Sequence, residues 1–395
     1  MKKKTLAVEK ISPDDGGFWF FGYFDKYPWD VSGRYVLANR AEFMDRQPTA
    51  DDKLIVGMID RHDNNKFIKI GETKAWCWQQ GCMLQWMNDG TGTKVIYNDR
   101  VGDKFVARVV DVFTGEKQTL CRPVYCLSPD GKYALSVNFS RLDKERPGYG
   151  YAGAEDIFSG EKHPENDGAW LIDIEKNTSK LIISVDQIVK TFNRPEMDDN
   201  PNWFNHLLFS PDSKRFAFLH RWRMPNRNHL THMLTADIDG ENIYPLNLDD
   251  MTSHYTWFAN DKIIAFANQN SGGWDYYEFT DQTDTVKQVG PASLHGQDGH
   301  CSYSLDKKWM LTDTYPDKEN NERSLYLVNN ESRKIFELGK FYADPNLATP
   351  TRCDLHPNWS RDCTQVCFDS IHEGTRHIYN YEYKNNNKIN SIVLQ

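Results

Sequence analysis

A His-x-x-aromatic segment recurs four times in the second half of this chain. The copies are His206-Leu-Leu-Phe209, His254-Tyr-Thr-Trp257, His300-Cys-Ser-Tyr303 and His356-Pro-Asn-Trp359, at intervals of 48, 46 and 56 residues. Such a period is typical of one four-stranded blade in a β-propeller. Because equivalent positions of successive blades lie side by side around a central channel, we expect the four imidazoles to meet in space.

A second repeat accompanies the histidines. Segments such as Leu208–Phe218 and Tyr303–Leu311 each combine a short strand, a Ser-x-Asp turn and a second apolar strand, and the turn residues supply local hydrogen bonds. Counting degenerate copies, seven such units fill the chain. We therefore predict an all-β fold, a seven-bladed β-propeller of four-stranded antiparallel blades, as a single domain over residues 1–395. A pair of β-sandwiches is the alternative.

Several structural details follow from this assignment. A strand around Leu6–Ile11 is expected to close the ring by pairing with the last blade, and helix should be scarce. Residues 140–169 and 189–203 are expected to be irregular loops between strands. Within the first of them, the Arg146–Gly153 segment is rich in glycine and tyrosine. This segment is either a flap over the channel mouth or a tight surface turn.

The charge and composition of the chain argue against some classes of binding partner and indicate a cellular compartment. The formal net charge of −9 argues against a nucleic-acid binder, which needs a basic face. No apolar run approaches the ~18 residues of a membrane helix, and the basic amino terminus has no apolar core of signal-peptide length. The eight cysteines form no C-x-x-C pair, which favours free thiols in a reducing compartment. We expect a cytoplasmic protein that is a monomer or a weak homo-oligomer.

Two sets of polar residues should converge on one face of the propeller. The first set lies where inner strands begin, and the second lies just after the second strands. The first set is Lys26, His206, His254, His300 and His356, with Met83 and Val124 in the remaining slots, and the second includes Asn39, Arg40, Asn98, Arg100, His220, Arg221, Arg223, Asp313, Tyr315 and Asp369. Ionisable residues from separate segments gathered in one concavity are the usual form of an active centre.

Three residues of these blades could hold a metal ion. Asp354 lies two residues before His356, and in a strand these positions point to the same side. His300 on the neighbouring blade would complete the set. Imidazole nitrogens and a carboxylate suit a divalent transition metal. We therefore predict a metal site at His300, Asp354 and His356.

The arginines indicate an anionic ligand, since guanidinium groups bind carboxylates with two parallel hydrogen bonds. A uronic acid is one such ligand, and its glycosidic bond is broken by β-elimination when a base removes the proton next to the carboxylate. His254 and Arg221 are the predicted catalytic residues. The predicted substrate-binding residues are Arg40, Arg100, Arg223, His206 and Tyr315. Alternatively, the arginines form ion pairs with nearby acids such as Glu42 and Asp99.

At His254-Tyr-Thr-Trp257, Gly299-His-Cys-Ser-Tyr303 and Cys353-Asp-Leu-His-Pro357 the chain resembles the oligogalacturonate lyases, seven-bladed propellers of the bacterial cytoplasm that act in pectin degradation. The resemblance implies a manganese ion held by His300 and His356, with His254 as the catalytic histidine. The family pattern Gln-x-x-His-x-His corresponds here to residues 351–356. Thr351 stands in the glutamine slot and Asp354 replaces one histidine, which implies a harder set of ligands.

The sequence thus predicts a metal-assisted lyase for short acidic oligosaccharides, with a divalent metal, manganese by the resemblance, as cofactor. Two alternatives stay open. A non-catalytic propeller would bind carbohydrate or protein at the same channel mouth. A glycoside hydrolase would need two carboxylates roughly 5–10 Å apart, for which Asp313, Asp354 and Asp369 are the candidates.

Overall fold

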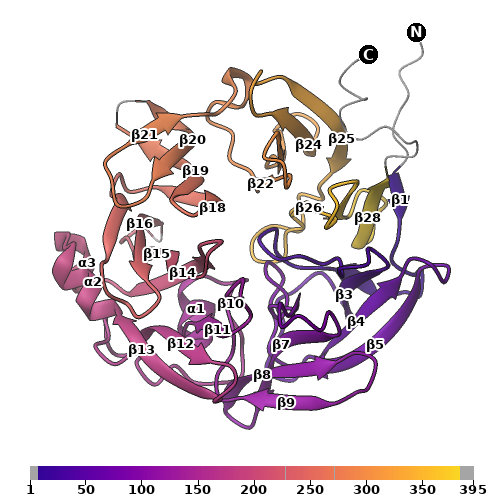
Figure 1. The fold of residues 1–395 in the computed structure, drawn as a ribbon, viewed down its shortest axis with the longest axis horizontal. Helices are drawn as coiled ribbons and strands as arrows, with labels where there is room; N and C mark the ends of the chain where they lie inside the picture. The colour runs from indigo at the N-terminus through magenta and orange to yellow at the C-terminus, as the bar shows by residue number, and fades with distance from the viewer. Residues whose placement is uncertain (1–7, 227, 271, 383–395) are drawn as a thin grey trace.

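In a computed structural model, the chain forms seven four-stranded antiparallel sheets that are arranged as blades around a central axis (Figure 1). The structure describes residues 8–226, 228–270 and 272–382. The predicted seven-bladed propeller of four-stranded antiparallel blades is therefore confirmed.

Each blade is built from strands that follow one another in sequence. Going outward from the channel, the first three blades are β2 (Phe18–Phe20), β3 (Tyr35–Ala41), β4 (Leu54–Asp60) and β5 (Lys66–Thr73); β6 (Gln85–Trp86), β7 (Lys94–Val101), β8 (Lys104–Asp111) and β9 (Lys117–Leu120); and β10 (Cys126–Leu127), β11 (Tyr133–Ser136), β12 (Gly168–Asp173) and β13 (Thr178–Ser184). The next three are β14 (Asn202–Phe209), β15 (Arg215–Arg223), β16 (His229–Asp237) and β17 (Tyr244–Asn247); β18 (Thr252–Ala259), β19 (Lys262–Gln269), β20 (Gly273–Thr280) and β21 (Val286–Gln288); and β22 (Ser302–Tyr303), β23 (Trp309–Asp313), β24 (Glu322–Asn329) and β25 (Ile335–Tyr342).

The seventh blade combines the two ends of the chain. It contains β26 (Asn358–Trp359), β27 (Gln365–Ser370), β28 (His377–Glu382) and, as its outermost strand, β1 (Val8–Lys10). Val8 pairs with Tyr381 and Lys10 with Tyr379. The predicted closing strand is thus confirmed for its described part, while Leu6 and Ala7 lie outside the described residues. This pairing joins the first and last segments of the chain in one sheet and closes the ring.

The two stretches expected to be irregular contain short helices, so that prediction was wrong. They are α1 (Phe139–Glu145), α2 (Val185–Thr191) and α3 (Pro195–Asp199), besides a 3-10 turn, η1 (Ala292–Leu294). Side-chain caps explain the first two, since Asn138 and Ser184 each accept a hydrogen bond from the amide three residues on, at 3.0 Å. Such caps satisfy amide groups that the first helical turn leaves free.

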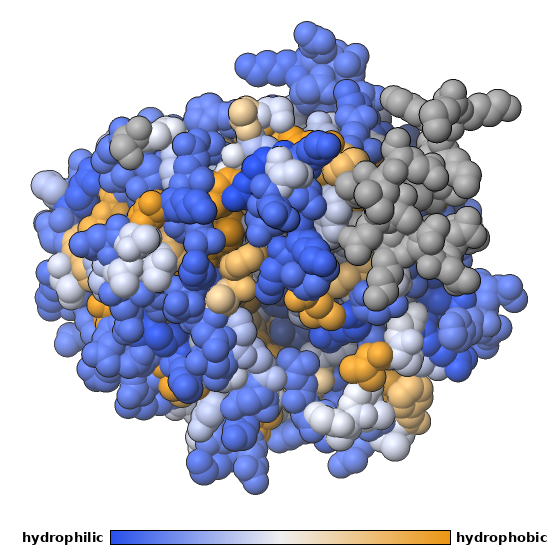
Figure 2. Space-filling view, turned by 45° about the horizontal axis from the view of Figure 1, so that its top comes forward, coloured by the Kyte–Doolittle hydropathy of each residue, from blue (hydrophilic) through white to orange (hydrophobic). Residues whose placement is uncertain are grey.

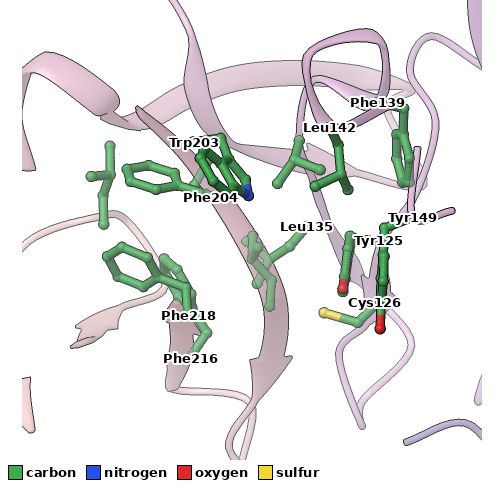
Figure 3. Close-up of a cluster of buried hydrophobic side chains, with 14 of the residues drawn as sticks. Tyr125, Cys126, Leu135, Phe139, Leu142, Tyr149, Trp203, Phe204, Phe216 and Phe218 are labelled. Atoms are coloured by element: carbon green, nitrogen blue, oxygen red, sulfur yellow. The ribbon is translucent and has the colours of Figure 1, made fainter. Parts of the chain in front are cut away.

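Large aromatic side chains fill the space between blades. Figure 3 shows Tyr125 and Cys126 of the third blade beside Trp203 and Phe216 of the fourth, in the largest buried cluster of the structure. The face drawn in Figure 2 is mainly hydrophilic. The eight cysteines are free thiols. In the described residues, no helix has the length and apolar character needed to span a membrane.

Candidate active site at the channel mouth

The four imidazoles of the repeat meet around one aromatic ring. Tyr23, in the loop after β2, contacts each of them edge-on, with ring-centroid distances of 5.4 Å to His206, 6.5 Å to His254, 6.2 Å to His300 and 5.1 Å to His356. The predicted convergence of the histidines is therefore correct. Tyr23 was not among the predicted residues, although it precedes Lys26 by only three positions.

The backbone at these positions is irregular. His206 was expected to begin its inner strand, but β14 begins four residues earlier, at Asn202, and its register shifts between Asn205 and Leu208. His206 and His356 have positive φ angles of 52° and 42°, which are uncommon for residues other than glycine. A bulge inserts an extra residue and re-aims its side chain, and at this bulge the imidazole of His206 contacts Tyr23.

The polar residues expected just after the second strands lie within them instead, Asn98 in β7 and Asp369 in β27, and they anchor the backbone at the channel mouth. Asn98 donates to the carbonyl of Val124 at 2.8 Å and accepts from its amide at 2.7 Å. Asp369 accepts hydrogen bonds from the amides of Phe21 at 3.0 Å and Gly22 at 3.4 Å. These side chains therefore fix the segments that enter the channel.

His300, Asp354 and His356 lie close enough to share one ion. All three are buried, and each offers one ligand atom within 4.8 Å of the others. Nε2 of His300 and Nε2 of His356 are buried without a hydrogen-bond partner. Nδ1 of His300 lies 2.8 Å from Asp313, and such a carboxylate leaves the Nε2 lone pair available. Two free imidazole nitrogens beside a carboxylate fit a divalent cation.

The carboxylate of Asp354 also has two guanidinium partners. Its Oδ1 lies 2.8 Å from Nη2 of Arg323, and its Oδ2 lies 2.7 Å from Nε of Arg352. Burial would raise the pKa of Asp354, but Arg352 and Arg323 together hold the pKa well below its ordinary value. A cation bound here would share the carboxylate with two positive groups. Asp354 is therefore an anchor for both arginines as well as a candidate ligand.

His254 stands next to this triad with a carboxylate partner of its own. Its Nδ1 lies 3.0 Å from Oδ1 of Asp298, and its ring centroid is 4.1 Å from that of His300. Tyr315 lies 6.4 Å from the same ring, centroid to centroid. The structure therefore brings His254 and Tyr315 together, as predicted. It adds Asp298, which the repeat does not reveal because it lies in the loop before His300.

The predicted arginines are divided between the mouth and the periphery. Arg221 is buried, and its Nε and Nη1 have no hydrogen-bond partner. Burial, with a contribution from Arg146, lowers the pKa of Arg221 to about 9. Arg223 lies beside it in β15, 5.1 Å above the ring of Trp203.

Two other predicted arginines are engaged elsewhere. Arg40 pairs with Asp15 at 2.8 Å and with Glu42, as the alternative interpretation expected. Arg100 donates to the carbonyl of Gly153 at 2.9 Å and to another main-chain carbonyl. In the described residues, no contact links either guanidinium to the four histidines.

His206 is buried like the other three histidines and packs against residues of the first and fifth blades. It is 1% exposed, its Nε2 lies 3.8 Å from Asp25, and its ring packs 4.3 Å from Tyr255. Asp25 itself forms a buried ion pair with Lys26 at 2.7 Å. His206 therefore lies between Tyr23 and Tyr255, next to this ion pair.

Three loops from different blades meet over the mouth. The amide of Gln79 donates to the carbonyl of Gly148 at 3.1 Å, and its side chain donates to the carbonyls of Pro350 and Arg352 at 3.2 and 3.0 Å. Arg352 in turn donates to the hydroxyl of Tyr149 at 3.2 Å. The Arg146–Gly153 segment is therefore a largely buried wall of the site, and the surface-turn interpretation was wrong.

Comparison with known proteins supports the fold. No protein-family model and no curated protein matches the chain. Among solved structures, an oligogalacturonate lyase from Vibrio parahaemolyticus is 16% identical with a TM-score of 0.66, over 98% of this chain and 96% of that one. An oligogalacturonate lyase in complex with manganese is 16% identical with a TM-score of 0.67, over 96% and 94%. At this identity, the likeness establishes a shared propeller fold.

Proposed function

We propose that this protein is a lyase that cleaves short uronate-containing oligosaccharides by β-elimination. The observation that carries the proposal is the pairing of His254 with Asp298, 3.0 Å apart, directly beside the buried cluster of His300, Asp354 and His356. This arrangement combines a base with a site for positive charge. The two similar structures, both oligogalacturonate lyases, support the same class of substrate.

The reaction assigns His254 the role of general base. When Nδ1–H donates its hydrogen bond to Asp298, the lone pair lies on Nε2, and Nε2 can remove the hydrogen on the carbon next to the uronate carboxylate. The C–H electrons form the new carbon–carbon double bond, and the bond to the leaving sugar oxygen breaks. That oxygen then takes up a proton. Tyr315, 6.4 Å from the His254 ring, lies beside the base and packs against the sugar.

We further propose manganese as the cofactor. One similar structure is a manganese complex, and imidazole with carboxylate is a suitable donor set. A divalent cation held by His300, Asp354 and His356 would neutralise the uronate carboxylate and so make the neighbouring proton more acidic. Because the cysteines are free, we also propose that the protein works in the cytoplasm.

The carboxylates do not favour a glycoside hydrolase. That chemistry needs two carboxyl groups free to protonate the leaving group and to attack or activate water. Asp313 lies against His300, Asp354 pairs with two arginines, and Asp369 accepts from the amide of Phe21. Each candidate carboxylate therefore already has a hydrogen-bond or ion-pair partner within the protein.

The test is direct. Purified protein is supplied with manganese and a panel of short uronate oligosaccharides, and the unsaturated product is followed by its ultraviolet absorbance. We expect product with at least one of them, and its loss in His254→Ala. His62→Ala, on the exposed outer turn after β4, is the matched control and should retain activity. Binding of these sugars without product would instead indicate the non-catalytic propeller.

A further inference from the structure

Two arginines and a histidine line the mouth on the side of the fourth blade. Nη1 of Arg146 lies 3.2 Å from Nε2 of His229, which begins β16. Burial lowers the pKa of His229 well below its ordinary value, and Arg221 and Arg146 lower it further. Both guanidinium groups therefore act on the same imidazole, and the three side chains face one another.

The two guanidinium charges of this group are not paired with acids in the described residues. Across the described ranges, no carboxylate lies within ion-pairing distance of Arg146 or Arg221, and buried guanidinium nitrogens of both have no hydrogen-bond partner. Arg221 is only 4% exposed. By contrast, Arg323 and Arg352 share Asp354. A buried cation without a partner costs free energy, and a bound anion would relieve that cost.

We propose that Arg146, Arg221 and His229 form an oxyanion subsite that takes a second acidic group of the ligand. Its ligand chemistry is a carboxylate, or a sulfate or phosphate ester, held by charge-assisted hydrogen bonds from the two guanidinium groups. The subsite is separate from the cluster at Asp354. The identification of the ligand as a sugar rests on the proposed function; the anion site itself does not.

Tyr149 lies between the subsite and the candidate metal cluster. Arg146 lies 4.6 Å above the ring of Tyr149, and the hydroxyl of Tyr149 accepts a hydrogen bond from Arg352 at 3.2 Å. A single tyrosine thus forms the wall between the subsite and the candidate metal cluster. The two acidic groups of the ligand would accordingly lie on opposite sides of Tyr149.

Binding of simple anions tests the subsite without any enzymatic assay. The protein is labelled with ¹⁵N-histidine and titrated with sodium sulfate, phosphate or acetate, with sodium chloride at matched ionic strength as the reference. We expect sulfate, phosphate or acetate to shift the His229 side-chain resonance, assigned with His229→Asn, while chloride does not. Tighter binding of sulfate or phosphate would indicate that the natural ligand carries a sulfate or phosphate ester. Tighter binding of acetate would indicate that it carries a carboxylate.

Variants separate binding from folding. Arg221→Gln and Arg146→Gln should each weaken anion affinity by about tenfold or more, the value of one charge-assisted contact. Arg40→Gln, which removes a peripheral ion pair, should leave the affinity unchanged. Because Arg221 has no partner, Arg221→Gln should not lower the unfolding temperature, whereas a structural arginine would lower it.

The outcomes distinguish this subsite from the proposed lyase activity. Anion binding at His229 without lyase activity would support the subsite and count against the proposed function. Lyase activity with no response of His229 to sulfate, phosphate or acetate would overturn the subsite alone. An equal response to chloride, or unchanged affinity in Arg221→Gln and Arg146→Gln, would overturn it as well.

Discussion

The double ion pair of Asp354 makes a prediction about the protein without metal. Replacing Asp354 by Asn keeps the size of the side chain but removes its charge. If this residue were only a metal ligand, the stability of the metal-free protein would not depend on it. Because it also neutralises Arg323 and Arg352, we expect the metal-free variant to be destabilised.

The structure sets the magnitude of this effect. The side chain of Asp354 is 0% exposed, that of Arg323 is 4% exposed, and that of Arg352 is 16% exposed. At about 2.8 Å and an effective dielectric constant of about 20, each contact has a gross attraction of roughly 6 kcal/mol. Removing one partner of a buried pair typically costs a net ~3–5 kcal/mol. We expect about 3 kcal/mol, because Arg352 keeps hydrogen bonds to Tyr149 and Thr349.

Urea unfolding in the presence of a chelator measures this quantity. The matched control is Asp51→Asn, which removes the acid of an exposed pair with Lys74 and should shift the midpoint very little. Adding Arg323→Met to Asp354→Asn should recover part of the loss, since one unpaired guanidinium disappears. An Asp354→Asn protein that unfolds at the wild-type urea concentration would refute the assignment of Asp354 as a structural counter-ion.

Three further predictions concern the metal, the base and pH. His356→Ala should abolish binding of the divalent cation while the metal-free protein keeps its circular dichroism spectrum; retained metal, by elemental analysis, would remove His356 from the ligand set. His254→Ala should lower turnover by about 10²-fold or more with metal content unchanged, and Asp298→Asn should also lower turnover without loss of metal; wild-type turnover in either variant would contradict its role. Burial raises the pKa of Asp369 to about 7, above the ~3.9 of an unfolded chain. The native state then binds the extra proton, so stability should fall as pH rises from about 4 to about 7. Urea midpoints measured across this range should fall less in Asp369→Asn than in the wild type. An identical fall in both proteins would show that Asp369 does not take up this proton.

Local sequence patterns were sufficient to predict the blades. The Ser-x-Asp turn and the two strands around it are fixed by hydrogen bonds between neighbouring residues, such as Ser210 to Asp212 at 2.8 Å. Such contacts leave a signature in every copy. The histidine register followed from the same repeat, because equivalent blade positions face one channel. His254, His300 and His356 could therefore be brought together from sequence alone.

The partners of these residues were decided only by the tertiary structure. Asp354 receives Arg323 from the neighbouring blade, and Arg146 meets His229 from a strand that begins 83 residues later in the chain. No periodicity marks such pairs, since they depend on how loops of different blades pack to within about 3 Å of one another. The sequence by itself determined the number of blades in the ring and the meeting of the four histidines in its channel. Only the packing of the loops decided which charges at the mouth are neutralised and which are left for a ligand.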